Sequence, residues 1–396
     1  MKLQDKLYCD TSKFKTIVGD NKDILKKYVC EMPFMYSDVQ WLSQFVCCPS
    51  WAPQTIRVYE DGGEKWDSID ETDDVMRNWT SPQAQDIRKS VLDGSYKYCN
   101  HMVCPRLNML INTGTKPHRF KEIDEFRELY NIHTEEDIIN YKTPPEEILF
   151  GFDRSCNLKC PSCRVNLIPN DDLESSEHKA KLHLLKSIED NFGSGLKRIM
   201  ITGSGDPFYS KIYRDYLINF DINKYPKLEQ LQIITNGNLL DEKLWKQMKA
   251  TPHIKVIEIS IDASTKDTYE NKTRLNGNWD KLINNLTFLA TQGHIIEEFV
   301  CSMVVSKHNY KEMYMFYELI TNIFKNSNFK WGLTICYRQI VDWGTYSPED
   351  LKELQVFNEE HVLFKEFLKE LKRIHNLKHI NHNFHHLVKW SHESTR

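Results

Sequence analysis

Three closely spaced cysteines are the residues of this chain best suited to chemistry. Cys156, Cys160 and Cys163 follow the pattern C-x3-C-x2-C, directly after an apolar run over residues 148–152. A structural zinc site needs four ligands, so zinc would take its fourth ligand from elsewhere in the chain. An iron–sulfur cluster held by three cysteines instead leaves one iron open to a substrate. The spacing therefore favours such a cluster, with a zinc site or three buried thiols as the alternatives.

The cysteine loop resembles the cluster loop of the radical S-adenosylmethionine (SAM) superfamily. In that superfamily, the amino and carboxylate groups of SAM chelate the open iron of a [4Fe-4S] cluster. An electron from the reduced cluster breaks the sulfur–C5′ bond, and the 5′-deoxyadenosyl radical takes a hydrogen atom from a substrate. The resemblance therefore implies a SAM-binding [4Fe-4S] cluster, SAM itself, and an electron donor of the flavodoxin or ferredoxin type.

A glycine-rich segment further along the chain supports the resemblance. The sequence TGSGDP at residues 202–207 is similar to the GGEP motif of the family, with aspartate where the family often has glutamate. Glycine lets the backbone approach a ligand closely, and a strand-end carbonyl or a carboxylate can accept hydrogen bonds from an ammonium group. Gly203, Ser204, Gly205 and Asp206 are therefore candidate SAM contacts.

Two later segments also match the family in order. Ser260 and Asp262 are expected on the same side of a strand, because side chains alternate along it, and the resemblance suggests that they lie near the SAM ribose. The segment YENKTR resembles one whose arginine pairs with the SAM carboxylate, which makes Arg274 a candidate, since a guanidinium can bind a carboxylate through two parallel bonds. An ordinary exposed arginine is the alternative. The segment TNG at residues 235–237 fits a strand-to-helix turn and a site role equally well.

A second group of cysteines precedes this region. Cys30, Cys47, Cys48, Cys99 and Cys104 stand in an order that resembles the SPASM/Twitch auxiliary-cluster modules, although those modules usually follow the radical SAM domain. One of the adjacent pair, together with the other three, would supply the four thiolates of a fully ligated auxiliary [4Fe-4S] cluster. A zinc ribbon with the same four ligands is the alternative.

The remaining cysteines and a histidine-rich tail are expected to carry no chemistry. Cys301 and Cys336 fall in or beside predicted strands, where a free cysteine commonly acts as a small buried apolar residue, and Cys9 is interpreted as a plain thiol. The tail is interpreted as a solvated, irregular segment rather than a metal site. Its histidines are His375, His379, His382, His385, His386 and His392.

Alternating apolar runs and amphipathic segments predict the elements that position these residues. Because parallel strands of one sheet need long crossovers, the alternation predicts an α/β domain with a parallel sheet, either open or partly closed. The resemblance selects a partial (β/α)6 TIM-like barrel, in which chemistry lies in the loops after the strands. The candidate strands cover residues 148–152, 198–202, 231–235, 256–261, 298–305 and 329–335.

Four regions are predicted along the chain. Residues 1–105 are expected to form a small Cys-rich α+β auxiliary domain, 106–145 a helical connector, 146–345 the barrel and 346–396 a C-terminal helical extension. The extension is expected to begin at Ser347 as helix N-cap, followed by Pro348. One amphipathic helix is expected to continue from there to residue 371.

Composition excludes several classes of protein. The 396 residues carry 52 Lys and Arg against 56 Asp and Glu, so the net charge of −4 gives no support to a nucleic-acid binder. No apolar stretch approaches the ~18 residues of a membrane span, and the first residues lack the pattern of an export signal. The 11 cysteines, an odd number, are then typical of a reduced cytoplasmic protein rather than a disulfide scaffold.

These observations predict a radical SAM enzyme that cleaves SAM reductively and abstracts hydrogen from a substrate. A peptide is the first candidate substrate, by likeness to enzymes that carry auxiliary-cluster modules. A sugar or small-molecule dehydrogenase or epimerase of the same superfamily is the second. The alternative from another class is a zinc-stabilised, non-enzymatic binding or regulatory protein.

Overall fold

The computed structural model describes residues 22–40, 43–56, 74–101, 103–385 and 387–388. Cys9, His386 and His392 lie outside these residues. The chain divides into two compact units, each made of several segments. The first comprises residues 1–153, 171–200 and 222–229, and the second comprises 154–170, 201–221 and 230–396. The amino-terminal cysteines therefore belong to the first unit, and the C-x3-C-x2-C loop belongs to the second.

The first unit combines short strands with helices. Strand β2 pairs in parallel with β5 and antiparallel with β3, while β1 and β4 form a separate antiparallel pair. The last residue of β6, Ile201, belongs to the second unit. The elements in order are α2 (Lys22–Lys27), β1 (Tyr28–Cys30), α3 (Met32–Met35), β2 (Tyr36–Gln40), β3 (Ser43–Phe45), α4 (Val75–Trp79), α5 (Pro82–Leu92), α6 (Pro105–Thr113), β4 (Phe120–Glu122), α7 (Ile123–Tyr130), α8 (Glu135–Ile139), β5 (Glu147–Gly151), α9 (Ser176–Phe192), β6 (Arg198–Ile201) and η3 (Ile222–Lys224).

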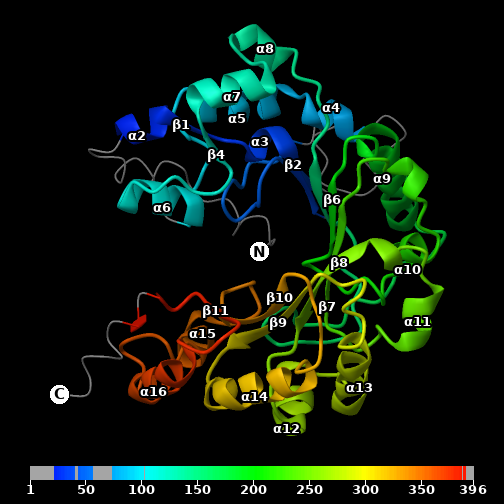
Figure 1. Ribbon diagram of the computed structural model, residues 1–396, viewed down its shortest axis with the longest axis vertical. Helices are drawn as coiled ribbons and strands as arrows, with labels where there is room; N and C mark the ends of the chain where they lie inside the picture. The colour runs from blue at the N-terminus through cyan, green and yellow to red at the C-terminus, as the bar shows by residue number, and fades with distance from the viewer. Residues whose placement is uncertain (1–21, 41–42, 57–73, 102, 386, 389–396) are drawn as a thin grey trace. The chain divides into compact units, whose positions relative to one another are not determined.

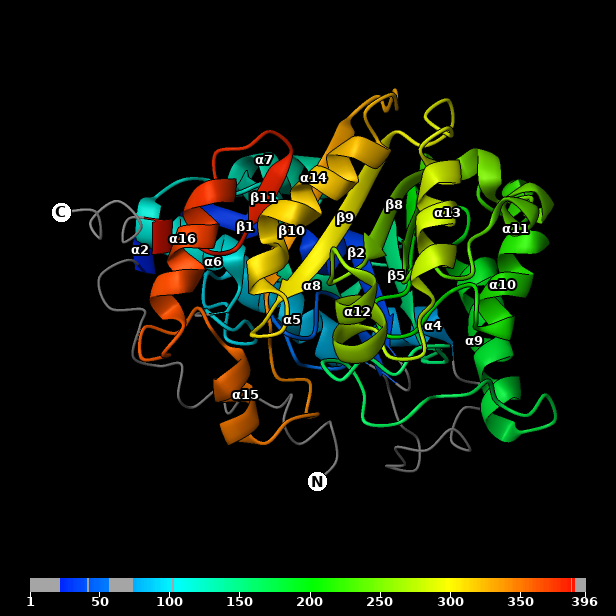
Figure 2. The same cartoon turned by 90° about the horizontal axis from the view of Figure 1, so that it is seen from below.

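The second unit is built on parallel strands in the order β7, β8, β9, β10, β11. Helices α13 and α14 lie on one face of β8 and β9, as the two views agree (Figures 1 and 2). The elements in order are α10 (Lys211–Ile218), β7 (Gln230–Thr235), α11 (Glu242–Gln247), η4 (Thr251–His253), β8 (Ile254–Ser260), α12 (Lys266–Thr268), the π-helix η5 (Tyr269–Thr273), α13 (Trp279–Leu289), β9 (Glu298–Val305), η6 (Tyr310–Glu312), α14 (Met313–Ile323), β10 (Gly332–Gln339), α15 (Pro348–Leu354), α16 (Phe364–Ile374) and β11 (Ile380–His382).

The mixed α/β class with mostly parallel strands is confirmed, and strands appear at all six predicted positions. Only β10 is displaced, since it starts at Gly332, three residues after the predicted start. β9 is buried along nearly its whole length, which is typical of a parallel strand covered on both faces. Cys301 is fully buried within it, and Cys336 is buried in β10, as expected of core thiols.

Two predictions for the C-terminal region are wrong. Ser347 does cap α15 by accepting a hydrogen bond from the Asp350 amide, but the helix ends at Leu354 and a separate helix, α16, follows. The histidine-rich tail is not wholly irregular, because β11 adds a parallel strand beside β10. There His382 is buried, and burial lowers its pKa to about 4. Among the described residues, no helix has the length and apolar character needed to cross a membrane.

The carboxyl ends of the strands in the second unit are aligned by the sheet register. Thr235 at the end of β7 pairs with Ile259, and Ser260 at the end of β8 pairs with Ser302. The loop after β7 turns at Gly237, whose φ is +77°. A Cβ atom there would lie 2.8 Å from Leu282 Cδ1, so both the conformation and the close packing require glycine.

We expect Gly237→Ala to lower the free energy of unfolding by about 2–4 kcal/mol, from left-handed strain and overpacking together. Gly332→Ala is the matched control, because Gly332 has φ +97° but a Cβ atom added to it would meet nothing within 4 Å. The control should lose only the strain, about 1–2 kcal/mol. Urea unfolding of the two variants measures the difference, and equal losses would contradict the packing argument.

Candidate functional site

The cysteine loop is folded by its own backbone. The Cys156 amide donates to the Ile168 carbonyl at 2.9 Å, which closes the base of the loop. The amides of Cys163 and Arg164 both donate to the Cys160 carbonyl, at 2.9 and 3.0 Å, which forms a tight turn between the second and third cysteines. Cys156 and Cys160 are buried, whereas Cys163 is exposed. The loop therefore gathers two sheltered thiols and one open thiol.

Each of the three sulfur atoms is approached by a side-chain N–H group. Arg164 Nη2 donates to Cys163 Sγ at 3.3 Å, and Arg274 Nη1 donates to Cys160 Sγ at 3.4 Å. Asn236 Nδ2 lies 3.9 Å from Cys156 Sγ, at the long end of a hydrogen bond to sulfur. N–H donors around cysteine sulfurs are a typical outer shell of iron–sulfur clusters and influence their potential. The residues present therefore fit a three-cysteine cluster.

Burial makes these thiols poor anions without a bound metal. It raises the pKa of Cys156 to about 12, a shift that the charge of Arg164 opposes. Burial also raises the pKa of Cys160, against the opposing charge of Arg274. Both thiols are therefore protonated at neutral pH, and metal binding at this loop has to release protons.

The glycine-rich segment is held beside the cysteine loop. Thr202, with φ +62°, is fully buried and accepts hydrogen bonds from the amides of Ser204 and Gly205 at its hydroxyl. The Ser204 carbonyl accepts from Arg164 Nη2 at 2.9 Å. Gly203 faces open space, since a Cβ atom there would meet nothing within 4 Å. A positive φ at a β-branched residue is strained, and such strain is concentrated at functional sites.

Both carboxylate oxygens of Asp206 accept hydrogen bonds from other groups of the chain. Its Oδ2 accepts from Thr235 Oγ1 at 2.7 Å and from the Asn236 amide at 2.9 Å. Its Oδ1 accepts from the amides of Phe208 and Tyr209 at 3.1 and 3.3 Å. Four donors occupy the four acceptor positions of a carboxylate. The predicted contact with SAM stays a prediction, but this saturation favours a positioning role that joins the ends of two strands.

Asp262 and Arg274 form a buried ion pair after β8. Arg274 Nη2 lies 2.8 Å from Asp262 Oδ2, and the Val304 amide donates to Asp262 Oδ1 at 2.7 Å. The π-helix η5 ends immediately before Arg274, a feature frequent at functional sites. The buried Nε of Arg274 has no hydrogen-bond partner among the described residues. Ser260 lies nearby on β8, where its hydroxyl accepts from Ser302 Oγ at 3.3 Å.

Arg164 and Tyr346 were not predicted from the sequence, whereas Asn236 lies in the TNG segment, whose site role was left open. Arg164 and Asn236 both approach cysteine sulfurs, and the only signal for Arg164 was a cation directly after the third cysteine. Tyr346 lies near Cys160, whose negative charge adds to the effect of burial in raising the pKa of the tyrosine. It belongs to the segment between β10 and α15, far from the cysteines in sequence, so no local pattern indicated it.

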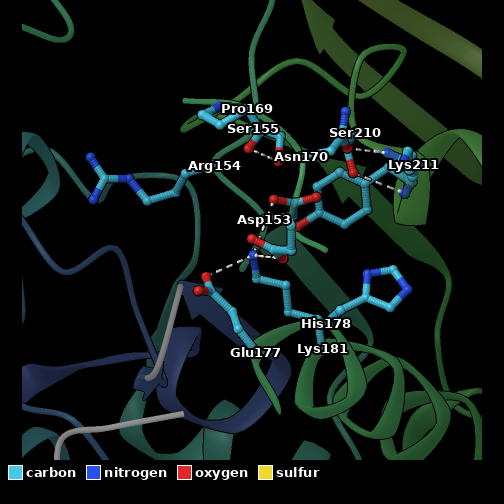
Figure 3. Close-up of polar contacts among 12 residues, drawn as sticks. Asp153, Arg154, Ser155, Pro169, Asn170, Glu177, His178, Lys181, Ser210 and Lys211 are labelled. Carbon is cyan, nitrogen blue, oxygen red and sulfur yellow. Dashed lines mark hydrogen bonds and ion pairs between the residues drawn. The ribbon is translucent and has the colours of Figure 1, made fainter. Parts of the chain in front are cut away.

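A buried lysine binds the residues that flank the cysteine loop in the sequence. Lys181 on α9 contacts Asp153, before the loop, at 3.3 Å and Asp171, after it, at 2.6 Å. Glu177 adds a third carboxylate at 3.0 Å. Figure 3 shows Asp153 and Glu177 both pointing at the Lys181 ammonium. Burial alone would lower the pKa of Lys181, but these carboxylates raise it, so the ammonium holds the two ends of the loop together.

The candidate cysteines of the first unit lie within reach of one another's charge. Burial raises the pKa of Cys47 well above its usual value, and the charges of Cys30, Cys99, Cys48 and Cys104 act in the same direction. Burial likewise raises the pKa of Cys48, but the main further influences there are hydrogen bonds from Ser50 and Trp51 and the charge of Asp38. The structure therefore distinguishes Cys47 from Cys48 by their surroundings.

Tyr96 links the segments that carry Cys30 and Cys99 through hydrogen bonds. Its hydroxyl donates to the Tyr28 carbonyl at 2.6 Å and accepts from the Cys30 amide at 3.2 Å. Its carbonyl accepts from the Cys99 amide at 2.9 Å.

Among the described residues, no three His, Cys, Asp or Glu side chains converge closely enough to bind a single metal ion. Cysteines that hold a cluster each bind a different iron, so they need not converge on one point.

The central part of the chain matches a known protein family. The radical SAM superfamily profile matches residues 152–320. The chain is 29% identical over 131 residues to GTP 3′,8-cyclase of Clostridium perfringens, covering 33% of this chain and 38% of that protein. It is 26% identical over 228 residues to the S-adenosylmethionine-dependent nucleotide dehydratase RSAD2 of Oncorhynchus mykiss, covering 57% and 60%. The chain thus matches less than two thirds of the length of either relative.

One solved structure resembles the chain at low similarity. A structure of TYW1 with a lysine-pyruvate adduct bound shares 17% identity over 59% of this chain and 72% of that chain. The TM-score between the two chains is 0.32.

We expect Asp206→Asn to destabilise the chain by about 2–4 kcal/mol, because the amide NH2 would face backbone and hydroxyl donors and leave them unpaired. Asp241→Asn is the control, since Asp241 caps α11 by accepting from the Leu244 amide and asparagine caps equally well. Urea unfolding measures both variants. A loss no greater in Asp206→Asn than in the control would contradict the saturated arrangement.

Proposed function

We propose that Cys156, Cys160 and Cys163 hold a [4Fe-4S] cluster that binds SAM. The reason is that the radical SAM superfamily profile matches residues 152–320 of this chain. When bound, this pair of cofactors supplies a 5′-deoxyadenosyl radical that removes hydrogen from a substrate. The single observation that best supports the proposal is the set of side-chain N–H groups at all three sulfurs. Such donors offset the charge of thiolates in a buried setting.

The chain's own residues have separate roles in this proposal. The backbone at Gly203 faces open space and can approach a ligand closely, with Ser204 and Gly205 in the same turn. The free Nε of Arg274 is a donor available to a carboxylate, as it has no partner among the described residues. Ser260 and Asp262 remain candidate contacts at the neighbouring strand end. Burial of Cys156 and Cys160 excludes water from two of the three thiols.

A nucleotide is the substrate class to test first. The names of the two relatives describe a GTP cyclase and a nucleotide dehydratase, and neither name describes a peptide substrate. The matched region covers only 38% and 60% of those proteins, so their substrates come to this chain only as a proposal. The peptide, and the sugar or small-molecule substrates of the alternative hypothesis, are the comparison arms of a substrate screen.

The first unit is proposed to hold an auxiliary centre on Cys30, Cys47, Cys99 and Cys104. Cys47 is chosen over Cys48 because the charges of the other three cysteines act on its thiol. Burial also raises the pKa of Cys30 to about 12, so this centre too has to release protons on loading. Four thiolates saturate a cluster, which favours electron transfer or structural support over substrate binding.

We expect the reconstituted, reduced chain to release 5′-deoxyadenosine from SAM, and Cys160→Ala to abolish this release by removing a cluster ligand. Cys336→Ala is the control, because Cys336 is a buried thiol on β10 outside the loop. Chromatography of the products, with iron and zinc quantitation, gives the readout. Equal release from Cys160→Ala and wild type, or stoichiometric zinc without iron, would refute the proposal and leave the zinc-stabilised binding protein.

A second prediction separates the adjacent cysteines of the first unit. Cys47→Ala should lower the iron content by about one cluster while Cys48→Ala retains it, because Cys47 stands among the other three thiols. SAM cleavage without substrate should persist in both variants. Iron quantitation of anaerobically reconstituted protein decides the matter, and equal iron loss from both would make the assignment of Cys47 wrong.

A further inference from the structure

Arg164 joins three parts of the cofactor site through one side chain. Its Nη1 donates to the Arg154 carbonyl at 3.1 Å, and its Nη2 donates to Cys163 Sγ at 3.3 Å and to the Ser204 carbonyl at 2.9 Å. Arg164 is 8% exposed, so this contact set is sheltered from water although Cys163 itself is exposed. One guanidinium therefore fixes the third cysteine and the glycine-rich segment at the same time.

The charge of Arg164 is not balanced by a carboxylate among the described residues. No Asp or Glu of that part of the chain lies within ion-pair distance of it, whereas Arg274 is paired with Asp262. A buried cation without an anion is costly, so an anion is expected to be bound there. The acidic groups next to the Arg164 guanidinium are the cysteine thiols of the loop. Arg164 is thus placed beside a sulfur that would carry negative charge as a cluster ligand.

We infer that Arg164 is a positioning residue that stabilises the reduced state of the cluster and holds the Ser204 carbonyl beside it. The inference rests on the proposed function. Reduction adds one negative charge to the cluster, and a cation 3.3 Å from a ligating sulfur favours that extra charge. Hydrogen bonds to the sulfurs and net charge are both determinants of cluster potential. Since the same Nη2 binds Ser204, the SAM-facing segment depends on the same side chain.

The test uses two variants and a matched control in the full chain. Arg164→Gln removes the charge, and Arg164→Lys keeps the charge but cannot donate to three acceptors from a planar fork. Lys159→Gln is the control, because Lys159 is an exposed cation of the same loop. Each protein is reconstituted anaerobically, and its iron content is measured first.

The potential is read by titration of the cluster's electron paramagnetic resonance signal in the absence of SAM. At a fixed poise, we expect the ratio of reduced to oxidised cluster to fall about tenfold in Arg164→Gln, equal to about 59 mV for one electron. Arg164→Lys should lie closer to wild type, and Lys159→Gln should be within twofold of it. An Arg164→Gln potential equal to that of Lys159→Gln would overturn the inference.

The positioning role is read from the concentration of SAM that half-changes the same signal. Both Arg164 variants should need at least tenfold more SAM than Lys159→Gln, because Ser204 is no longer held by a fork. If Arg164→Gln takes up no cluster, Arg164→Lys decides, and wild-type values of both potential and SAM requirement would overturn the inference. A wild-type chain that binds no iron overturns the proposed function, whereas a loaded cluster with unshifted values overturns this inference alone.

Discussion

The negative charge that a cluster would place on three sulfurs is the constraint on which the proposed site of the second unit depends. Burial favours protonated thiols at Cys156 and Cys160, whereas a cluster requires thiolates. The chain resolves this conflict with N–H donors drawn from three separate places: the loop itself, the end of β7 and the segment after η5. These donors would lower the free-energy penalty of the thiolate form, because two of the three are guanidinium groups that stay ionised.

The parallel arrangement explains how donors so distant in sequence reach one loop. In the second unit the strands end at the same edge, so Asn236 after β7 and Asp262 after β8 are brought to neighbouring positions. Asp206 links the glycine-rich segment to β7 through Thr235 and Asn236, and the Asp206 amide donates to the Ser155 carbonyl in the cysteine loop. Asp206, with its saturated carboxylate, thus connects the glycine-rich segment to the loop of the three cysteines.

The sequence predicted the strands well because their signals are local, while the role of the cysteines stays a prediction. Spacing identifies Cys156, Cys160 and Cys163, and apolar runs bounded by turns locate the six strands. Among the residues near those cysteines, Arg274 was a candidate and the segment with Asn236 was left open, whereas Tyr346 was not predicted because it reaches the loop only after the chain has folded over β10. The end of α15 was also missed, since apolar residues at helical spacing continue past Leu354 although the helix does not.

The two cysteine groups differ in how their protons and charges are handled, and this difference bears on their roles. The loop of the second unit places cations against Cys160 and Cys163, which suits a centre that changes charge during turnover. Around Cys47 the neighbours that affect the thiol are other cysteines, and Arg106 acts on Cys30 through its charge rather than as a donor to the sulfur. With a single cation that acts through its charge alone, the proposed auxiliary cluster would gain less from becoming more negative than the proposed SAM-binding cluster.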